Sequence, residues 1–68
     1  MNINISFGNK LKTERLKLKL SQEKLALKAG VDRTYVNDIE KGSRNVSLVI
    51  AEKLAIALKT NILTLLKE

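Results

Sequence analysis

The 68-residue sequence contains no cysteine, no histidine, no proline and no tryptophan, and it has one phenylalanine and one tyrosine. Without cysteine and histidine, the chain has neither disulfides nor an ordinary zinc site to stabilise it. The shortage of aromatic side chains disfavours RNA recognition, which depends on stacking of splayed bases. We therefore expect one domain, residues 1–68, whose stability depends on well-packed helices or on a partner subunit.

Long apolar runs and an export signal are also missing. No apolar run approaches the roughly 18–20 residues that span a bilayer, and the first ten residues, MNINISFGNK, lack a basic region followed by an apolar stretch. The chain has no histidine or cysteine and no glycine-rich phosphate loop, so we expect no enzyme, with no catalytic residue, cofactor or metal. We expect a cytoplasmic, nucleoid-associated protein with no membrane contact and no small-molecule ligand.

The charge of the chain is mostly positive. Thirteen lysines and arginines outnumber seven acidic residues and give a formal net charge of +6. This excess favours a polyanionic partner, either nucleic acid or an anionic membrane surface. Many small soluble domains are somewhat basic without such a partner, so the charge alone does not identify one.

The segment SQEKLALKAGVDRTYVNDI, residues 21–39, contains two short helical patterns that meet at a glycine. Ser21 and Asp32 are good N-cap residues for the two helices, and Gly30, followed by an apolar residue, is typical of a helix end. Two helices joined by a short glycine-containing turn form a helix-turn-helix, here expected at about residues 21–41. Its second helix exposes side chains suited to reading DNA: Arg33, Thr34, Asn37 and Lys41.

Three further helices are predicted around this motif, which makes the expected fold all-α with five helices. They are, with the capping residue of each, 7–18 (Ser6), 48–59 (Ser47) and 62–67 (Asn61). Residues 1–5 are expected to be a lead-in. Apolar stripes that face the core are expected in the first and fourth helices, at Phe7, Leu11 and Leu18 and at Leu48, Ala51, Leu54, Ala55 and Leu58.

The last two predicted helices carry more apolar residues than one inward stripe uses. Exposed apolar patches on small proteins usually mark an interaction surface, and a symmetric homodimer is the commonest outcome. We therefore expect a dimerisation surface at about residues 48–68. The alternative is that the last helix folds back and covers these side chains. The residues expected at the interface are Val49, Ile50, Ile56, Leu63 and Leu66.

Arg15 falls beside the apolar stripe of the first predicted helix. A partly buried guanidinium needs a carboxylate partner, and Glu40, at the end of the second helix of the motif, is the candidate. The alternative is an arginine at the surface with no fixed partner.

The chain resembles the phage-repressor/Cro-like helix-turn-helix proteins, the Xre family, over roughly residues 7–66. The matching positions are Gln22, Ala26, Gly30, Val31, Val36 and Ile39. Within that family, the segment VDRTYVNDIEKGSRNVSL is most similar to the controller proteins of restriction–modification systems. The resemblance implies a compact lambda-repressor-like domain and a homodimeric transcription regulator that binds a pseudo-palindromic operator in double-stranded DNA and regulates its own operon. The alternative is an antitoxin-type or phage-repressor-type regulator whose apolar surface binds another protein.

The resemblance and the chemistry of the side chains together suggest residue roles. Arg33 suits a guanine edge, Thr34 a base edge or a thymine methyl, and Asn37 an adenine. Gln22, at a helix N-terminus, suits a phosphate. For Tyr35, a phosphate contact and a ring packed into the corner remain open. The pair Arg15–Glu40 resembles one that ties the first helix to the third in this family. The residues expected at the DNA backbone are Gln22, Tyr35, Lys41, Ser43, Arg44 and Asn45.

Overall fold

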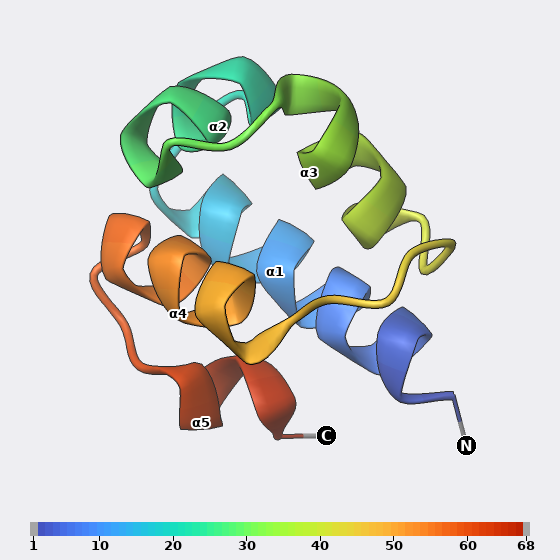
Figure 1. Ribbon diagram of the computed structural model, residues 1–68. Coiled ribbons are helices and arrows are strands. Elements are labelled where there is room, and N and C mark those ends of the chain that lie inside the picture. Colours follow the sequence, from blue (N-terminus) through green and yellow to red (C-terminus); the bar gives the residue numbers. More distant parts are fainter. Residues whose placement is uncertain (1, 68) are drawn as a thin grey trace.

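A computed structural model describes residues 2–67 of the chain and contains, within them, five helices and no strand (Figure 1). The helices are α1 (Ile3–Lys17), α2 (Gln22–Ala29), α3 (Arg33–Glu40), α4 (Leu48–Ala57) and α5 (Ile62–Leu66). The prediction of an all-α fold with five helices is confirmed. None of these helices is long and apolar enough to cross a bilayer.

Four of the helices begin where the capping residues predict. The oxygen atom of each cap accepts a backbone N–H of the first turn, and the four caps are Ser21 (from Lys24), Asp32 (from Thr34), Ser47 (from Ile50) and Asn61 (from Thr64). Ser21 and Asp32 thus start α2 and α3. Between its two helices, Gly30 adopts a left-handed conformation with φ 71°, which glycine accepts without steric cost.

The predicted start of the first helix is wrong. Asn2 caps α1, because its Oδ1 accepts the backbone N–H groups of Asn4 at 2.9 Å and Ile5 at 3.4 Å. Asn is as good a cap as Ser, so the helix begins before the predicted cap, Ser6, which lies inside it. The segment expected to be a lead-in is, from Ile3 onward, the first turn of α1.

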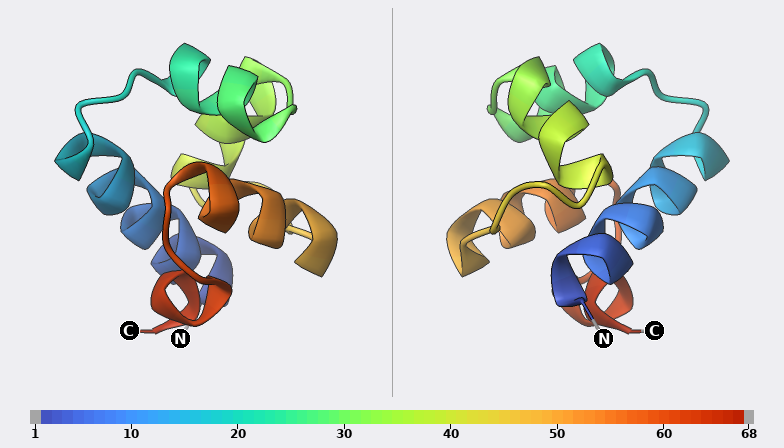
Figure 2. Two further views of the ribbon diagram at one scale, coloured as in Figure 1. Left: turned by 90° about the vertical axis from the view of Figure 1, so that its left-hand side faces the viewer. Right: turned by 90° about the vertical axis from the view of Figure 1, so that its right-hand side faces the viewer.

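The helix-turn-helix lies at one end of the molecule and α5 at the other. Figure 1 shows α2 and α3 at the top, α5 at the bottom, and α1 and α4 between them. The two views of Figure 2 keep this order. α1 contacts both α3 and α5, and α4 contacts α2 and α5. The helix-turn-helix thus packs on α1 and α4, which lie between it and α5.

The core is a cluster of buried apolar side chains contributed by all five helices. Its members are Phe7, Leu11, Leu25, Ala26, Ala29, Val36, Ile39, Ala51, Leu54, Ala55, Leu58 and Leu65. Two residues predicted to face the core do not, since Leu18 is 44% exposed and Leu48 is 74% exposed. Leu18 is the C-cap of α1, where the helical stripe ends, and Leu48 is the first residue of α4 and borders a surface groove.

Gly8 allows α1 and α3 to approach closely. A Cβ atom at this position would collide with the backbone carbonyl oxygen of Ile39 and would lie 3.1 Å from that of Glu40. Real Cβ atoms do not tolerate such a contact with backbone, which cannot swing aside as a side chain does. Gly8 therefore sets the distance at which the last turn of α3 is held against α1.

Candidate nucleic-acid interface

One side of α3 is buried and the opposite side is open to solvent. Val36 and Ile39 anchor the helix in the core, which turns Arg33, Thr34 and Lys41 outward, all three exposed. Among residues 2–67, none of these three side chains takes part in an ion pair or a hydrogen bond to another side chain. Their donor groups are therefore available to an external partner.

A buried ion pair holds the last turn of α3. Arg15 Nε donates to Glu40 Oε2 at 2.7 Å, and Arg15 Nη2 donates to Glu40 Oε1 at 3.0 Å, which makes the contact bidentate. The side chains are only 9% and 5% exposed. The remaining Nη1 donates to the backbone carbonyl of Leu20 at 2.7 Å. The two residues predicted as a pair thus lie together. Their contacts join α1 to α3 and to the turn that precedes α2.

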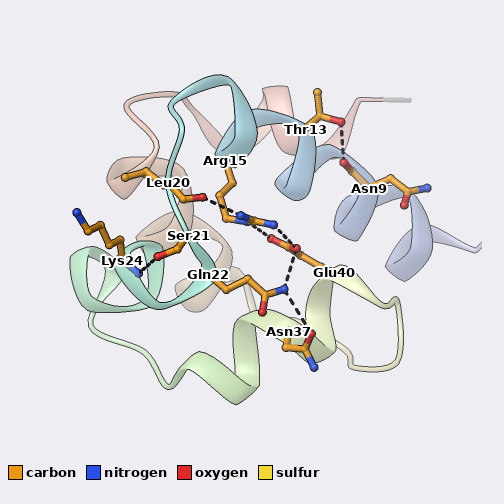
Figure 3. A network of polar contacts seen from close by, with 9 residues as sticks. All are labelled: Asn9, Thr13, Arg15, Leu20, Ser21, Gln22, Lys24, Asn37 and Glu40. Carbon is orange, nitrogen blue, oxygen red and sulfur yellow. Dashed lines mark hydrogen bonds and ion pairs between the residues drawn. The ribbon is translucent and has the colours of Figure 1, made fainter.

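Gln22 extends this network to the open side of α3 (Figure 3). Its Nε2 donates to Glu40 Oε1 at 3.1 Å and to Asn37 Oδ1 at 3.3 Å. An amide nitrogen has two N–H bonds, so this conformation leaves none for a phosphate, the role expected of Gln22. In the first turn of α2, Ser21 Oγ accepts the backbone N–H of Lys24 at 3.0 Å, whereas helix geometry leaves the N–H groups of Gln22 and Glu23 without an internal acceptor.

The same contact orients Asn37. Because its Oδ1 faces Gln22, its Nδ2 is turned away from Glu40 and keeps both of its donors. The adenine contact expected of Asn37 needs a donor and an acceptor side by side. Oδ1 retains a second lone pair for this purpose, provided that the Gln22 contact holds the amide in place.

The loop after α3 folds back against the helix. Arg44 Nη2 donates to Asp38 Oδ2 at 3.1 Å, and the Arg44 guanidinium carbon lies 4.6 Å from the centroid of the Tyr35 ring. Ser43 Oγ donates to the backbone carbonyl of Asp38 at 3.1 Å. The Tyr35 ring packs against the core. This is the packed arrangement, one of the two alternatives given above for Tyr35. The structure therefore brings Tyr35, Ser43 and Arg44 together at one edge of α3.

Asn45, also predicted to contact the DNA backbone, is engaged within the protein. Asn45 Oδ1 accepts a hydrogen bond from Asn4 Nδ2 at 2.7 Å, which ties the loop to the first turn of α1. Asp38, in contrast, was missed by sequence reasoning. It follows Thr34 by four residues and so shares the open side of α3, but its pairing with Arg44 depends on how the loop turns.

A second surface, on α4 and α5, is apolar. Val49 and Ile56 are 66% and 67% exposed and border a groove on α4 together with Leu48, Glu52 and Lys53. Leu63 is 66% exposed and Leu66 37%, whereas Ile50 is half-buried against the core. α5 folds back through Leu65 and the partly buried Ile62, and it leaves Val49, Ile56 and Leu63 exposed. We refer to Val49, Ile56, Leu63 and Leu66 as the α4/α5 surface.

Within residues 2–67, no group of three or more acidic side chains gathers in a way that could hold a metal ion. The open side of α3 offers cationic and amide donors instead. Such groups suit the phosphates and base edges of DNA.

Comparisons with known proteins agree with this geometry. A family model described as Helix-turn-helix matches residues 11–65. The chain is 52% identical over 58 residues to the control protein C.BamHI of Bacillus amyloliquefaciens, covering 84% of this chain and 72% of that protein. It is 53% identical to the control protein C.MunI of a Mycoplasma species, with coverages of 84% and 78%. The crystal structure of the restriction-modification controller protein C.AhdI from Aeromonas hydrophila superimposes with a TM-score of 0.89 at 47% identity, covering 91% of this chain and 94% of that one.

Proposed function

The chain belongs to the helix-turn-helix family and is a DNA-binding regulator related to restriction–modification controller proteins, and we propose that it controls a restriction–modification operon by binding its operator as a homodimer. The predicted family resemblance is confirmed. The family consists of transcription regulators, so the chain is not an enzyme. Its proposed place of action is the nucleoid, in the cytoplasm.

The observation that carries the proposal is the identity of about half of the residues to two control proteins over 84% of this chain. That stretch is too long to leave out the helix-turn-helix. It therefore supports a shared way of presenting α3 to DNA. The open side of α3, with its exposed Arg33 and Thr34, is the part of the molecule that such a role requires.

The contacts with bases are assigned to three residues of α3. Arg33 offers a bidentate fork to guanine O6 and N7, the commonest specific contact in the major groove. Thr34 offers a hydroxyl and a methyl group, and Asn37 offers an amide held in place by Gln22. The backbone contacts are assigned to Lys41, Arg44 and the N-terminus of α2, where free N–H groups and the helix dipole favour a phosphate. Ser43 is not assigned one, because its only hydroxyl donor is engaged by the backbone carbonyl of Asp38.

The α4/α5 surface is assigned to the dimer interface. One copy measures 29 × 21 × 21 Å, and successive major grooves on one side of DNA lie about 34 Å apart. Two copies joined through a surface remote from α3 have the dimensions to place one α3 helix in each groove. The apolar side chains of the surface supply the area that a symmetric contact buries.

Selection of binding sites from a random pool of duplexes tests the proposal. The selected sequence is expected to be an inverted repeat whose half-sites are centred about 10 base pairs apart. Sedimentation is expected to show a dimer that binds one such duplex. A monomer well above micromolar concentration, with and without the selected duplex, contradicts the dimer, and no enrichment contradicts the DNA-binding role.

Two further observations identify the regulated system. Neighbouring genes for a methyltransferase and an endonuclease support a restriction–modification operon. A different protein that co-purifies from the native operon and is released by substitution of Val49 or Ile56 supports the antitoxin-type or phage-repressor-type alternative. In that case the α4/α5 surface binds a different protein in place of a second copy.

A further inference from the structure

We propose that Asp38 is a specificity-determining residue, which restrains Arg44 on DNA of arbitrary sequence and releases it where a cytosine faces α3. The proposal rests on the DNA-binding role given above. It goes beyond that role because it assigns a carboxylate to the reading surface and couples it to a backbone contact.

Asp38 differs from the two other acidic residues of α3 and its N-cap. Asp32 is engaged as the cap of α3, where its Oδ1 accepts the N–H of Thr34 at 2.7 Å. Glu40 is buried against Arg15. The carboxylate of Asp38, in contrast, lies on the open side of α3 and is neutralised by Arg44 alone among the described residues. A carboxylate so close to DNA needs a compensating partner, because phosphates repel it.

Arg44 is shared between two partners on α3. Its Nη2 lies 3.1 Å from Asp38 Oδ2, and its guanidinium stacks over the Tyr35 ring at 4.6 Å. The side chains of Arg44 and Asp38 are 47% and 28% exposed, so the ion pair is partly hydrated. Pairs of this kind are weak. A phosphate can therefore compete with Asp38 for the guanidinium, and DNA binding becomes an exchange of one anion for another.

The exchange has a consequence for Asp38. When Arg44 turns to a phosphate, Asp38 loses its cation while DNA approaches. A carboxylate only accepts hydrogen bonds, and the base-edge donor that it fits in the major groove is the N4 amino group of cytosine. A DNA site that places a cytosine opposite Asp38 supplies a hydrogen-bond donor to the carboxylate, and a site with another base there does not. Asp38 therefore makes the backbone contact of Arg44 conditional on sequence.

The test compares Asp38→Asn with the wild-type protein on two duplexes, the one selected by the wild-type protein from a random pool and a scrambled one. Asparagine keeps the size of the side chain and leaves the backbone bond to Ser43 intact, so the variant is expected to fold. We expect tighter binding to the scrambled duplex and little change on the selected one. The ratio of the two affinities should fall by roughly tenfold, within the range for one base contact.

Three further readouts separate this mechanism from a change of net charge. Glu14→Gln is the matched control, because it removes one carboxylate from a surface pair of the same 3.1 Å length, with Lys17 on α1. Asp38→Asn should steepen the salt dependence on the scrambled duplex by about one unit, since Arg44 becomes free to neutralise a phosphate. Arg44→Ala should weaken binding to the selected duplex more than to the scrambled one. Repeated selection with Asp38→Asn should lose a cytosine at one fixed position in each half-site.

Equal gains on both duplexes, of the size given by Glu14→Gln, overturn the proposal. Equal losses for Arg44→Ala on both duplexes, or an unchanged preference for cytosine, also overturn it. If the wild-type protein itself selects no sequence, the DNA-binding role fails and the inference fails with it. If the wild-type protein discriminates and Asp38→Asn discriminates equally well, only the inference fails.

Discussion

The substitution Glu40→Gln tests how much of the stability depends on the buried pair with Arg15. The carboxylate of Glu40 accepts three hydrogen bonds, two from Arg15 and one from Gln22. Glutamine has nearly the same shape, but one of its two terminal atoms is a donor. Either orientation of the amide therefore places an N–H group against a donor of Arg15 or Gln22 and removes the charge that compensates the guanidinium.

The expected loss of stability in Glu40→Gln follows from the burial of both side chains. With side chains 9% and 5% exposed, the two charges are almost out of water, and removing one partner of a buried pair costs about 3–5 kcal/mol. A domain of this size has a free energy of unfolding of roughly 3–10 kcal/mol. Since 1 kcal/mol shifts the melting temperature of such a domain by about 4–8 °C, we expect Glu40→Gln to melt at least 12 °C below the wild-type protein.

Thermal and urea unfolding, followed by circular dichroism at 222 nm, measure this loss. The control is Glu14→Gln, which breaks the surface pair with Lys17 at 3.1 Å and should cost less than about 1 kcal/mol. Arg15→Met combined with Glu40→Gln should cost less than the sum of the two single variants, because no unpaired charge remains. If Glu40→Gln and Glu14→Gln cost the same, burial of the Arg15–Glu40 pair does not stabilise the fold.

Four other substitutions test the remaining parts of the molecule. Gly8→Ala should destabilise the fold by about 1–3 kcal/mol in urea unfolding, because its Cβ collides with the carbonyl of Ile39; a neutral result would show that α1 and α3 can move apart. Arg33→Ala should weaken binding to the selected duplex by about 1–3 kcal/mol and relax the preference at one base pair, whereas Lys41→Ala should weaken binding to all duplexes alike and flatten the salt slope by roughly one unit. If Arg33→Ala and Lys41→Ala have the same effect on all duplexes, the assignment of Arg33 to a base and of Lys41 to the backbone is wrong. Ile56→Asp, at a side chain 67% exposed, should leave the melting temperature of the monomer nearly unchanged and abolish the dimer in sedimentation; a dimer that persists would remove the α4/α5 surface from the interface.

The sequence by itself determined the helices and the motif. Caps, the glycine at the turn and apolar spacing act over three or four residues, so Ser21, Asp32 and Gly30 specify α2 and α3 without reference to the rest of the chain. The same local reasoning chose the wrong cap for α1, because Asn2 and Ser6 are both good caps and only the packed structure distinguishes them.

The tertiary structure alone decided which polar groups on α3 are free. The inward turn of the Gln22 amide, the pairing of Asp38 with Arg44 and the close approach at Gly8 join residues that are distant in sequence or lie on different elements. Such contacts depend on the angle and distance at which helices pack, and no short-range pattern encodes them. Residue types therefore identified a DNA-binding helix, and packing determined which of its side chains remain available to DNA.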